Sequence, residues 1–288
     1  MLSIFAMVFT CVCVFGAFVA FGGSMGVVIH GLMSEMPMIL GAAVGAFLLG
    51  NNMPVVKGAM KGMGKAFKGP KWKAQDYKDI LLLMFGILKL VRTKGMIVLE
   101  QHIENPEQSS IFQQYPKIMH DHFAVEFICD TLRMMTMNFD DPHQVEDVME
   151  KQLEKHHHEL HTLAHSIQSM ADAMPALGIV AAVLGVIKTM GSINKPVEVL
   201  GEMIGGALTG TFLGVFLAYG FIGPIASKMG QCYDQEHKFY EIIRAILISH
   251  LNGNAPQISA EIGRTNVPTI YQPTFREMEE LQSNINFA

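Results

Sequence analysis

The chain has 288 residues, of which 50% are apolar and only 16% are charged. Its mean hydropathy of +0.29 excludes an ordinary soluble domain, and its net charge of −5 gives no support for nucleic-acid binding. The four cysteines form no CxxC pair, so neither a disulfide framework nor a zinc site is expected.

Four stretches are long and apolar enough to cross a membrane, because about 20 helical residues span a hydrocarbon core of roughly 30 Å. They are approximately 2–21, 36–56, 173–193 and 203–227. The first carries no charge and no basic segment precedes it, so we expect a retained span and not a cleavable signal peptide. Lys188 interrupts the third span, but a lysine near a helix end can extend its amine to the membrane interface.

Orientation follows from the lysines that flank the predicted spans. Seven lysines follow the second span between Lys57 and Lys78, whereas the two short hairpin loops contain only Lys195. Because lysine-rich loops stay in the cytoplasm, we place the middle block, the tail and both chain ends inside. The prediction is an all-α integral membrane protein with four transmembrane helices in two hairpins. Its segments are a first hairpin (1–56), a helical cytoplasmic domain (57–172), a second hairpin (173–227) and a cytoplasmic C-terminal tail (228–288).

The middle block has the pattern of a helical domain. Residues 79–92 carry a broad apolar face at helical spacing, and 120–138 and 143–170 continue as helices. Breaks fall at Asn105-Pro106 and around Pro142. No stretch alternates clearly between apolar and polar residues, so no strand is expected.

Two motifs suggest chemistry, and both have a simpler interpretation. The stretch KHHHELHTLAH (155–165) places His157, His161 and His165 four residues apart, a spacing that can chelate a metal. Without an HExxH motif, a charged helix face near the membrane is preferred and a metal site is the alternative. GAMKGMGKAF (58–67) lacks the glycine spacing and the Ser/Thr of a phosphate loop and fits a basic strip at the membrane surface better. The sequence gives no reason to predict an enzyme.

Small residues recur every four positions within the predicted spans. They are Gly206, Gly210, Gly214 and Ala218 in the fourth, Gly178, Ala182, Ala181 and Gly185 in the third, and Gly41, Gly45, Ala42 and Ala46 in the second. Small residues at this spacing let helix backbones approach closely. Since these faces exceed what four helices need, we expect packing against other chains as well as within the chain.

The predicted spans lack the ionisable group that an ion path usually has. No Asp, Glu or Arg lies in the middle of any of them, and the polar groups deep in the fourth are Thr209, Thr211 and Tyr219. An ion path through this chain would therefore take its carboxylate from a partner, whose helix would lie against the small-residue faces.

Five stretches, in order along the chain, resemble one family. They are GGSMG (22–26), GAAVGAFLLGNN (41–52), RTKGMIVLEQHIENP (92–106), MPALGIVAAVLGVIKTMG (174–191) and GTFLGVFLAYGFIGPIA (210–226). Together they resemble the flagellar stator A subunits, a branch of the MotA/TolQ/ExbB proton channel family. The resemblance covers essentially the whole chain, and the third stretch is specific to the stator branch.

The resemblance implies a ring, understood as a pentamer, around two stator B subunits in the bacterial inner membrane. Each B subunit would supply a helix with the proton-accepting Asp and a peptidoglycan-binding domain. Protons moving past that Asp would turn the ring, and the cytoplasmic domain would push on a charged helix of the flagellar rotor, generating torque for motility and chemotaxis. No cofactor is implied beyond the coupling proton.

Functional positions follow from the same motifs. Arg92 and Glu100 match the charged pair that engages the rotor, where exposed charges steer a partner and still release it; without the motif, two solvated charges would be preferred. Pro175 and Pro224 match the prolines that couple ion passage to conformational change. Their simpler interpretations are a first-turn helix position for Pro175 and a kink for Pro224.

The predicted ion pathway consists of Thr211, Ala182 and Tyr219. Thr211 matches the pore threonine that faces the partner's Asp, and its simpler interpretation is a hydroxyl bonded within its own helix. Ala182 matches the position, seven residues after Pro175, where sodium-type stators carry threonine and proton-type stators carry alanine. A hydroxyl helps to replace the hydration shell of sodium and is not needed for a proton relay, so protons are the expected coupling ion.

Three other functions stay open at this point. The nearest is a TolQ/ExbB-like transducer that energises an envelope partner, against which the stretch 92–106 argues. A secondary transporter calls for an intramembrane charge and broken helices in each half. A purely structural scaffold would tolerate Thr211→Val, whereas a motor subunit would lose swimming and ion flux.

Overall fold

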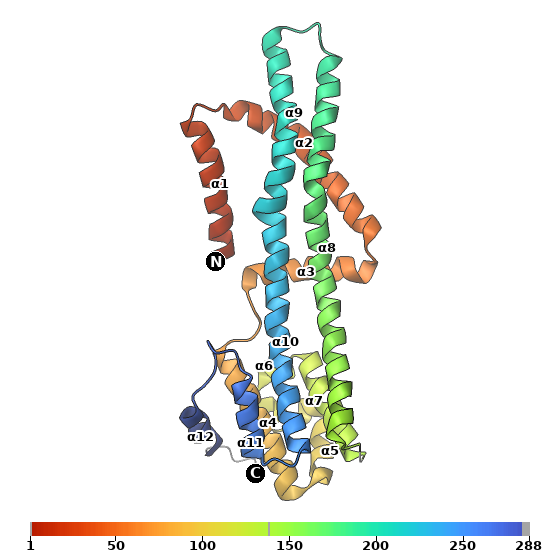
Figure 1. The fold of residues 1–288 in the computed structure, drawn as a ribbon, viewed down its shortest axis with the longest axis vertical. Coiled ribbons are helices and arrows are strands. Elements are labelled where there is room, and N and C mark those ends of the chain that lie inside the picture. Colours follow the sequence, from red (N-terminus) through yellow and green to blue (C-terminus); the bar gives the residue numbers. More distant parts are fainter. Residues whose placement is uncertain (1, 138, 284–288) are drawn as a thin grey trace. The chain divides into compact units, whose positions relative to one another are not determined.

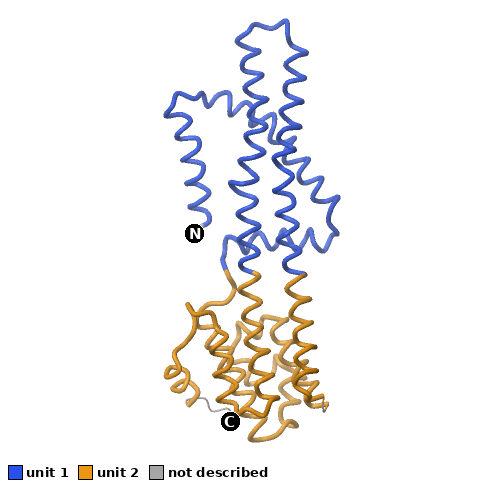
Figure 2. Tube along the Cα trace, in the orientation of Figure 1, with its two compact units in different colours: residues 1–69, 159–232 blue, residues 70–158, 233–288 orange. Residues whose placement is uncertain are grey.

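The computed structural model describes residues 2–137 and 139–283, and no strand occurs in these ranges (Figure 1). The chain divides into two compact units: unit 1 contains residues 1–69 and 159–232, and unit 2 contains 70–158 and 233–288 (Figure 2). The all-α prediction is confirmed for the described residues. The predicted domain boundaries and the pairing of spans into hairpins stay predictions.

Twelve α-helices, two 3-10 turns and one π-helical segment make up the described chain. They are α1 (Leu2–Ala20), α2 (Met25–Gly50), α3 (Met53–Lys68), α4 (Ala74–Lys94), α5 (Met96–Glu104), η1 (Pro106–Gln108), η2 (Phe112–Gln114), α6 (Pro116–Met119), α7 (His122–Thr136), α8 (Pro142–Met190), α9 (Val197–Leu217), the π-helix η3 (Ala218–Ile222), α10 (Gly223–Leu251), α11 (Pro256–Thr265) and α12 (Phe275–Ser283).

Four helical stretches are long and apolar enough to cross a membrane. They are Ser3–Ala20, Met25–Gly50, Pro142–Met190 and Val197–Leu251, the last running through α9, η3 and α10. Each predicted span therefore corresponds to one such stretch, but three of the helices extend beyond the predicted bounds. The reason is that helical hydrogen bonds continue through polar residues, which end an apolar window without ending a helix.

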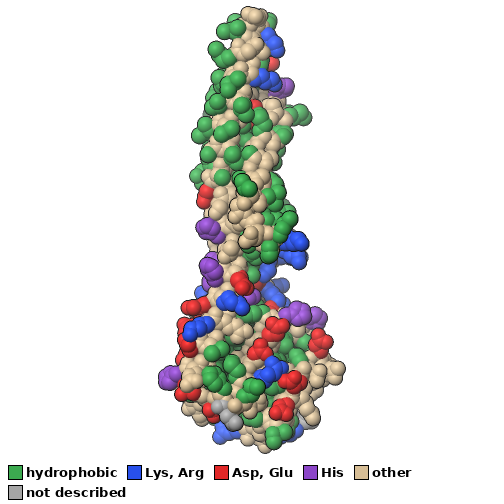
Figure 3. Space-filling view, turned by 90° about the vertical axis from the view of Figure 1, so that its right-hand side faces the viewer, with side chains coloured by type: hydrophobic (Ala, Val, Ile, Leu, Met, Phe, Trp, Pro, Cys, Tyr) green, Lys and Arg blue, Asp and Glu red, His purple; other side chains and the backbone are tan. Residues whose placement is uncertain are grey.

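Unit 1 has a small buried core on α2, α8, α9 and η3. Its members are Ile39, Ala43, Met174, Ala181, Leu213 and Ala218. Many larger hydrophobic side chains of this unit point outward, among them Phe5 (66% exposed) and Val180 (55% exposed). Figure 3 shows hydrophobic side chains at the surface of this unit. Such a surface suits surroundings of lipid or of other membrane helices.

Unit 2 has the large hydrophobic core of a water-soluble helical domain. The rings of Trp72 and Phe239 stack at 3.9 Å between centroids, and Tyr77 packs edge-on against Phe239 at 5.6 Å. All three side chains are nearly inaccessible. Burial of such rings is a large part of the driving force for folding in water, so this aromatic cluster stabilises the interior of unit 2.

Buried carboxylates in unit 2 are paired. Asp121 accepts a hydrogen bond from the Tyr240 hydroxyl at 3.0 Å, accepts another from the Ala124 N–H at 2.9 Å as the N-cap of α7, and forms an ion pair with Lys71. Asp76 pairs with Lys117 in the same unit. Because a buried charge without partners is costly, these contacts fix the start of α7 against α10.

Candidate ion pathway and partner surfaces

The backbones of α8 and α9 approach closely through glycine. A Cβ atom on Gly214 would lie 2.7 Å from the Met174 carbonyl oxygen and 2.8 Å from the Gly178 Cα atom. A Cβ on Gly178 would likewise lie 2.8 Å from the Gly210 carbonyl oxygen. No side chain fits at such distances, so these glycines serve packing within the chain.

The helix α2 joins this pair through α9. A Cβ on Gly31 would lie 2.7 Å from the Thr209 Cβ and 3.0 Å from the Gly206 carbonyl oxygen. The small residues of α2 that the sequence singled out behave differently: a Cβ on Gly41 or Gly45 would meet nothing within 4 Å. The small-residue faces of α8 and α9 are thus used within unit 1, whereas the face of α2 at Gly41 and Gly45 is open.

One residue of the predicted ion pathway, Ala182, lies in the α8–α9 contact, and a second, Thr211, follows a residue of that contact. Ala182 is buried, and its backbone nitrogen lies 3.2 Å from the place that a Cβ on Gly210 would occupy. Thr211 follows Gly210 and is half-buried. Thr209 donates its hydroxyl to the Gly205 carbonyl at 2.9 Å, but the Thr211 hydroxyl has no hydrogen-bond partner among the described residues. The simpler interpretation of Thr211, a hydroxyl bonded to its own helix, does not hold.

Tyr219, the third residue of the predicted pathway, lies apart from the other two. It sits in the π-helix η3, and its side chain is 66% exposed. Together with Pro224 it lines a cavity of about 450 Å³ whose other side includes Thr10 of α1. The structure therefore places Ala182 beside Gly210, the residue before Thr211, and places Tyr219 with Pro224.

The two predicted coupling prolines occupy special places in their helices. Pro175 lies in the interior of α8, so its interpretation as a first-turn residue is wrong. Because proline lacks an N–H and its ring crowds the carbonyl four residues earlier, it interrupts the ladder of α8 without ending the helix. Pro224 is the second residue of α10 and directly follows η3, where the Gly223 N–H bonds to the Ala218 carbonyl five residues back. That wider turn makes room ahead of the proline ring.

The predicted rotor-binding pair lies in unit 2 on neighbouring helices. Arg92 is in the last turn of α4, and Glu100 is on α5. Gly95 separates the two helices with a φ of +81°, which favours glycine, and caps α4 by donating its N–H to the Val91 carbonyl. Both charged side chains are exposed, and within the described ranges neither takes part in an ion pair. Both are available to a partner.

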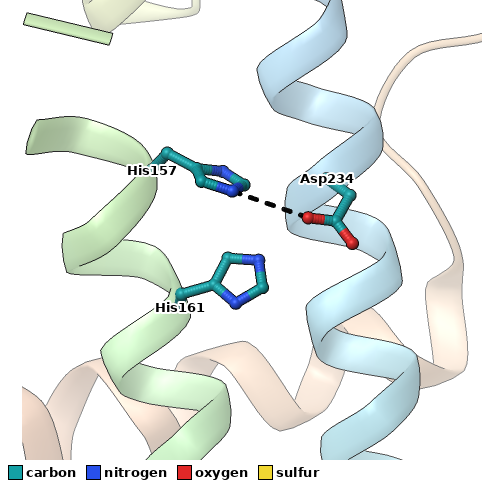
Figure 4. Close-up of side chains that lie close together, drawn as sticks. All are labelled: His157, His161 and Asp234. Carbon is teal, nitrogen blue, oxygen red and sulfur yellow. Dashed lines mark ion pairs between the residues drawn. The ribbon is translucent and has the colours of Figure 1, made fainter. Parts of the chain in front are cut away.

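The histidine-rich stretch is less exposed than predicted. In unit 2 the His156 ring stacks on Phe123 at 3.7 Å, and the His157 ring lies 4.3 Å from that of His237. Figure 4 shows His157 pointing from α8 toward Asp234 of α10, with 3.6 Å between Nε2 and Oδ1. These contacts give His156 and His157 a packing role. The alternative of a metal site stays a prediction.

One ionisable residue was missed by the sequence analysis. Glu35 lies within α2 and is only 4% exposed, whereas the sequence placed it in a loop outside the predicted span. The expectation that no acidic residue lies inside a spanning helix is therefore wrong. The error arose because the carboxylate ends the apolar window, although α2 begins ten residues earlier at Met25.

Comparison with known families places the chain in a class. Residues 4–95 match the family described as motility protein A N-terminal, and residues 119–242 match the MotA/TolQ/ExbB proton channel family. Together with the helices able to cross a membrane and their glycine-packed contacts, these matches define the chain as a member of a class of membrane proton channel proteins.

Individual relatives narrow the class to one family. The chain is 38% identical to "Motility protein A" of Escherichia coli over 93% of its own length and 90% of that protein, and 35% identical to "Chemotaxis protein LafT" of Vibrio parahaemolyticus over 93% and 94%. It belongs to the motility protein A family. Its fold is similar to the flagellar MotAB stator complex from Bacillus subtilis, with a TM-score of 0.74 at 20% identity over 96% of this chain and all of that one. A second similar structure is that of C. jejuni MotAB, with a TM-score of 0.71 at 20% identity over 93% and 95% of the two chains.

Proposed function

We propose that this chain is the A subunit of a flagellar stator, which assembles with a MotB-like B subunit and converts proton flow into torque on the rotor. The observation that carries the proposal is the 38% identity to a motility protein A over 93% of the chain. A match of this length includes both the apolar helices and unit 2. It favours the stator over a TolQ/ExbB-like transducer and over a secondary transporter.

Assembly with other chains is supported by the surface of unit 1. The face of α2 at Gly41 and Gly45 is open, and α8 exposes large apolar side chains such as Ile179 and Val183. Close approach of helices through small residues is the usual means of association in lipid. We propose that these faces bind neighbouring A subunits in a pentameric ring and the helices of two B subunits, in the bacterial inner membrane with both chain ends in the cytoplasm.

The ion path is proposed to run between this chain and the B subunit. Thr211 offers a hydroxyl without an internal bond, and Ala182, which lies beside Gly210, has no hydroxyl that would favour sodium. Each proton that crosses releases about 2.3 kcal/mol per 100 mV. That small amount of free energy must be converted into conformational change with little loss. We assign this conversion to Pro175 and Pro224, where the pattern of helical hydrogen bonds is already interrupted.

Contact with the rotor is proposed to use Arg92 and Glu100. Exposed charges without internal partners attract an oppositely charged helix at long range and hold it weakly enough to be released at each step. Replacing Arg92 by Glu is expected to stop swimming while leaving the subunit assembled. The matched control is Arg276→Glu on α12, which is also exposed in unit 2. Loss of swimming in both variants, or in neither, would contradict the assignment.

The decisive test uses two threonines two residues apart. The chain is co-expressed with a B-type subunit in a bacterium that lacks its own stator, and swimming and proton uptake are measured. Thr211→Val is expected to lose both, because its hydroxyl is unbonded and available, whereas Thr209→Val keeps both, because its hydroxyl is bonded within α9. Both variants should co-purify with the B subunit.

Three outcomes would count against the proposal. Failure of the wild-type chain to assemble with any B-type subunit would end the stator assignment. Swimming that depends on the sodium gradient and not on the proton gradient would overturn the coupling ion. Full activity of Thr211→Val would remove that residue from the pathway.

A further inference from the structure

The carboxylate of Glu35 is buried without a full set of partners. Its residue is 4% exposed, and Oε1 accepts a hydrogen bond from the Ser34 hydroxyl at 3.3 Å. The other oxygen, Oε2, has no hydrogen-bond partner among the residues that the structure describes. Burial of an incompletely paired carboxylate destabilises a fold. A group retained at this cost inside a spanning helix indicates a function.

The neighbouring helices leave room for this carboxylate by using glycine. A Cβ on Gly185 of α8 would lie 3.5 Å from Oε1, and a Cβ on Gly210 of α9 would lie 3.2 Å from Oε2. The Ala182 nitrogen is also 3.2 Å from that second position. The Glu35 carboxylate and the backbone of Ala182, a member of the proposed ion pathway, therefore meet at Gly210, the residue that precedes Thr211.

The carboxylate also lines a polar cavity of unit 1. The cavity has a volume of about 270 Å³, enough for several water molecules by the usual measure of one probe sphere each. The titratable groups that line it come from every element around Glu35: His30 of α2, Lys188 of α8, Lys195 of the α8–α9 turn and Glu202 of α9. Water in such a cavity would connect the buried carboxylate to the exposed rim at Lys195.

We propose that Glu35 is a proton-binding residue of the ion pathway, and this proposal rests on the function proposed above. A hydronium ion in the cavity transfers a proton to the Glu35 carboxylate, leaving water and a neutral carboxylic acid. The acid then donates the same proton to water on the side of Ala182 and Thr211, and the carboxylate is restored. A single carboxylate oxygen holds a proton covalently, whereas a sodium ion needs several oxygen ligands to replace its hydration shell, so the site favours protons over sodium.

The test compares two carboxylates of the same cavity in the full complex with the B subunit. Proton uptake is measured in vesicles across an imposed pH gradient, at several external pH values. Glu35→Gln keeps the shape of the side chain but exchanges no proton, and uptake is expected to fall on the order of 100-fold, the lower range for a positioned proton-transfer group. Glu202→Gln, on the exposed rim, is expected to change uptake by less than about two-fold.

A second readout separates proton binding from a structural role. Infrared difference spectra of the wild-type complex between high and low pH should contain carbonyl bands of protonated carboxyls, and Glu35→Gln should lose one component of these bands that Glu202→Gln keeps. Wild-type uptake in a Glu35→Gln complex overturns this proposal and leaves the stator assignment intact. A wild-type complex that assembles with no B subunit overturns the stator assignment instead.

Two further outcomes test the proposed role of Glu35. Where Glu35→Gln does not assemble, Glu35→Asp takes its place: the shortened carboxyl should slow uptake and shift its pH profile, and an unchanged rate and profile overturn the proposal. Sodium-driven charge flow that Glu35→Gln abolishes would overturn the selection of protons.

Discussion

In unit 1 the backbones of α8 and α9 touch at Gly178 and Gly214, whereas in unit 2 the elements are held apart by stacked rings such as Trp72 and Phe239. Unit 1 leaves large apolar side chains outside, and unit 2 places them inside. Water drives apolar groups together in unit 2. Lipid offers no such drive between helices, so unit 1 depends on close backbone contact. One rule for the placement of apolar side chains therefore cannot describe both units.

The largest expected effect breaks the backbone contact of unit 1. Gly214→Val would place a side chain within 2.7 Å of the Met174 carbonyl, and a backbone atom of a helix cannot move aside as a flexible side chain can. We expect no folded subunit in the membrane. Gly45→Val, on the open face of α2, should leave the subunit folded and lose only its complexes with other chains.

The measurement for this pair is protease resistance of the membrane-inserted chain together with native gel electrophoresis of the complex. If Gly214→Val and Gly45→Val are equally resistant to protease, then Gly214 is no more important for packing within the subunit than Gly45.

The next largest effect is expected from a cavity in the core of unit 2. Trp72→Ala removes a buried ring from its stack with Phe239 and is expected to lower the free energy of unfolding of this unit by about 3–5 kcal/mol. Thermal unfolding of the detergent-solubilised chain, followed by circular dichroism, measures the change. Ile97→Ala, at a site that is 81% exposed, is the control and should have no measurable effect.

A smaller effect tests the buried polar contact of unit 2. Tyr240→Phe removes the hydroxyl that bonds to Asp121 and is expected to cost about 1–2 kcal/mol, because Asp121 keeps its contacts with Lys71 and the Ala124 N–H. Tyr271→Phe is the matched control, since the Tyr271 hydroxyl makes no hydrogen bond within the described part of the chain. Equal stability of the two variants would contradict the role given to Asp121.

The smallest effect is a dependence on pH. Burial, and then the nearby Lys94, lower the pKa of His102, whose ring also hydrogen-bonds to Ser109 at 2.8 Å. The folded protein therefore holds this histidine neutral, and the unfolded chain binds a proton more readily. The contribution of His102 to the free energy of unfolding is fully present above pH 6.5, the ordinary pKa of histidine. It is lost as the pH falls below that value.

The expected loss is less than about 1 kcal/mol, because the ring is only half-buried. Unfolding curves of wild type and His102→Gln should converge at low pH and separate above pH 6.5. A difference that grows as the pH falls would give the opposite sign and refute the assignment.

The sequence analysis predicts the helical class and the positions of the apolar helices well, because long apolar runs and small-residue spacing are local signals. It does not predict where those helices begin and end. Glu35 stops an apolar run but not the helix, because its side chain finds space beside Gly185 and Gly210, which are far away in the sequence. A contact of that kind has no signature in one sequence.

The two prolines show the same limit. Pro175 is predicted at the start of a helix and instead lies inside the long α8, because the turns on both sides are stable enough to hold it. The π-helix before Pro224 is not predicted at all, since nothing in AYGFI distinguishes it from an α-helical turn. The predicted roles of Arg92, Glu100, Thr211 and Ala182 rest on motif resemblance and that of Tyr219 on its polar group within an apolar span, and the structure adds the exposure of each.

The π-helix at Ala218–Ile222 separates two faces that one continuous helix would have to share. An α-helix turns by about 100° per residue, and the extra residue held in η3 offsets all later side chains by that angle. The face of α9 that carries Gly206, Gly210 and Gly214 therefore does not continue along the same side of α10. Deleting one residue from η3 would restore an unbroken ladder and turn every side chain after Ile222 onto a different face. The loss of a single residue would therefore rotate α10 about its own axis relative to α9.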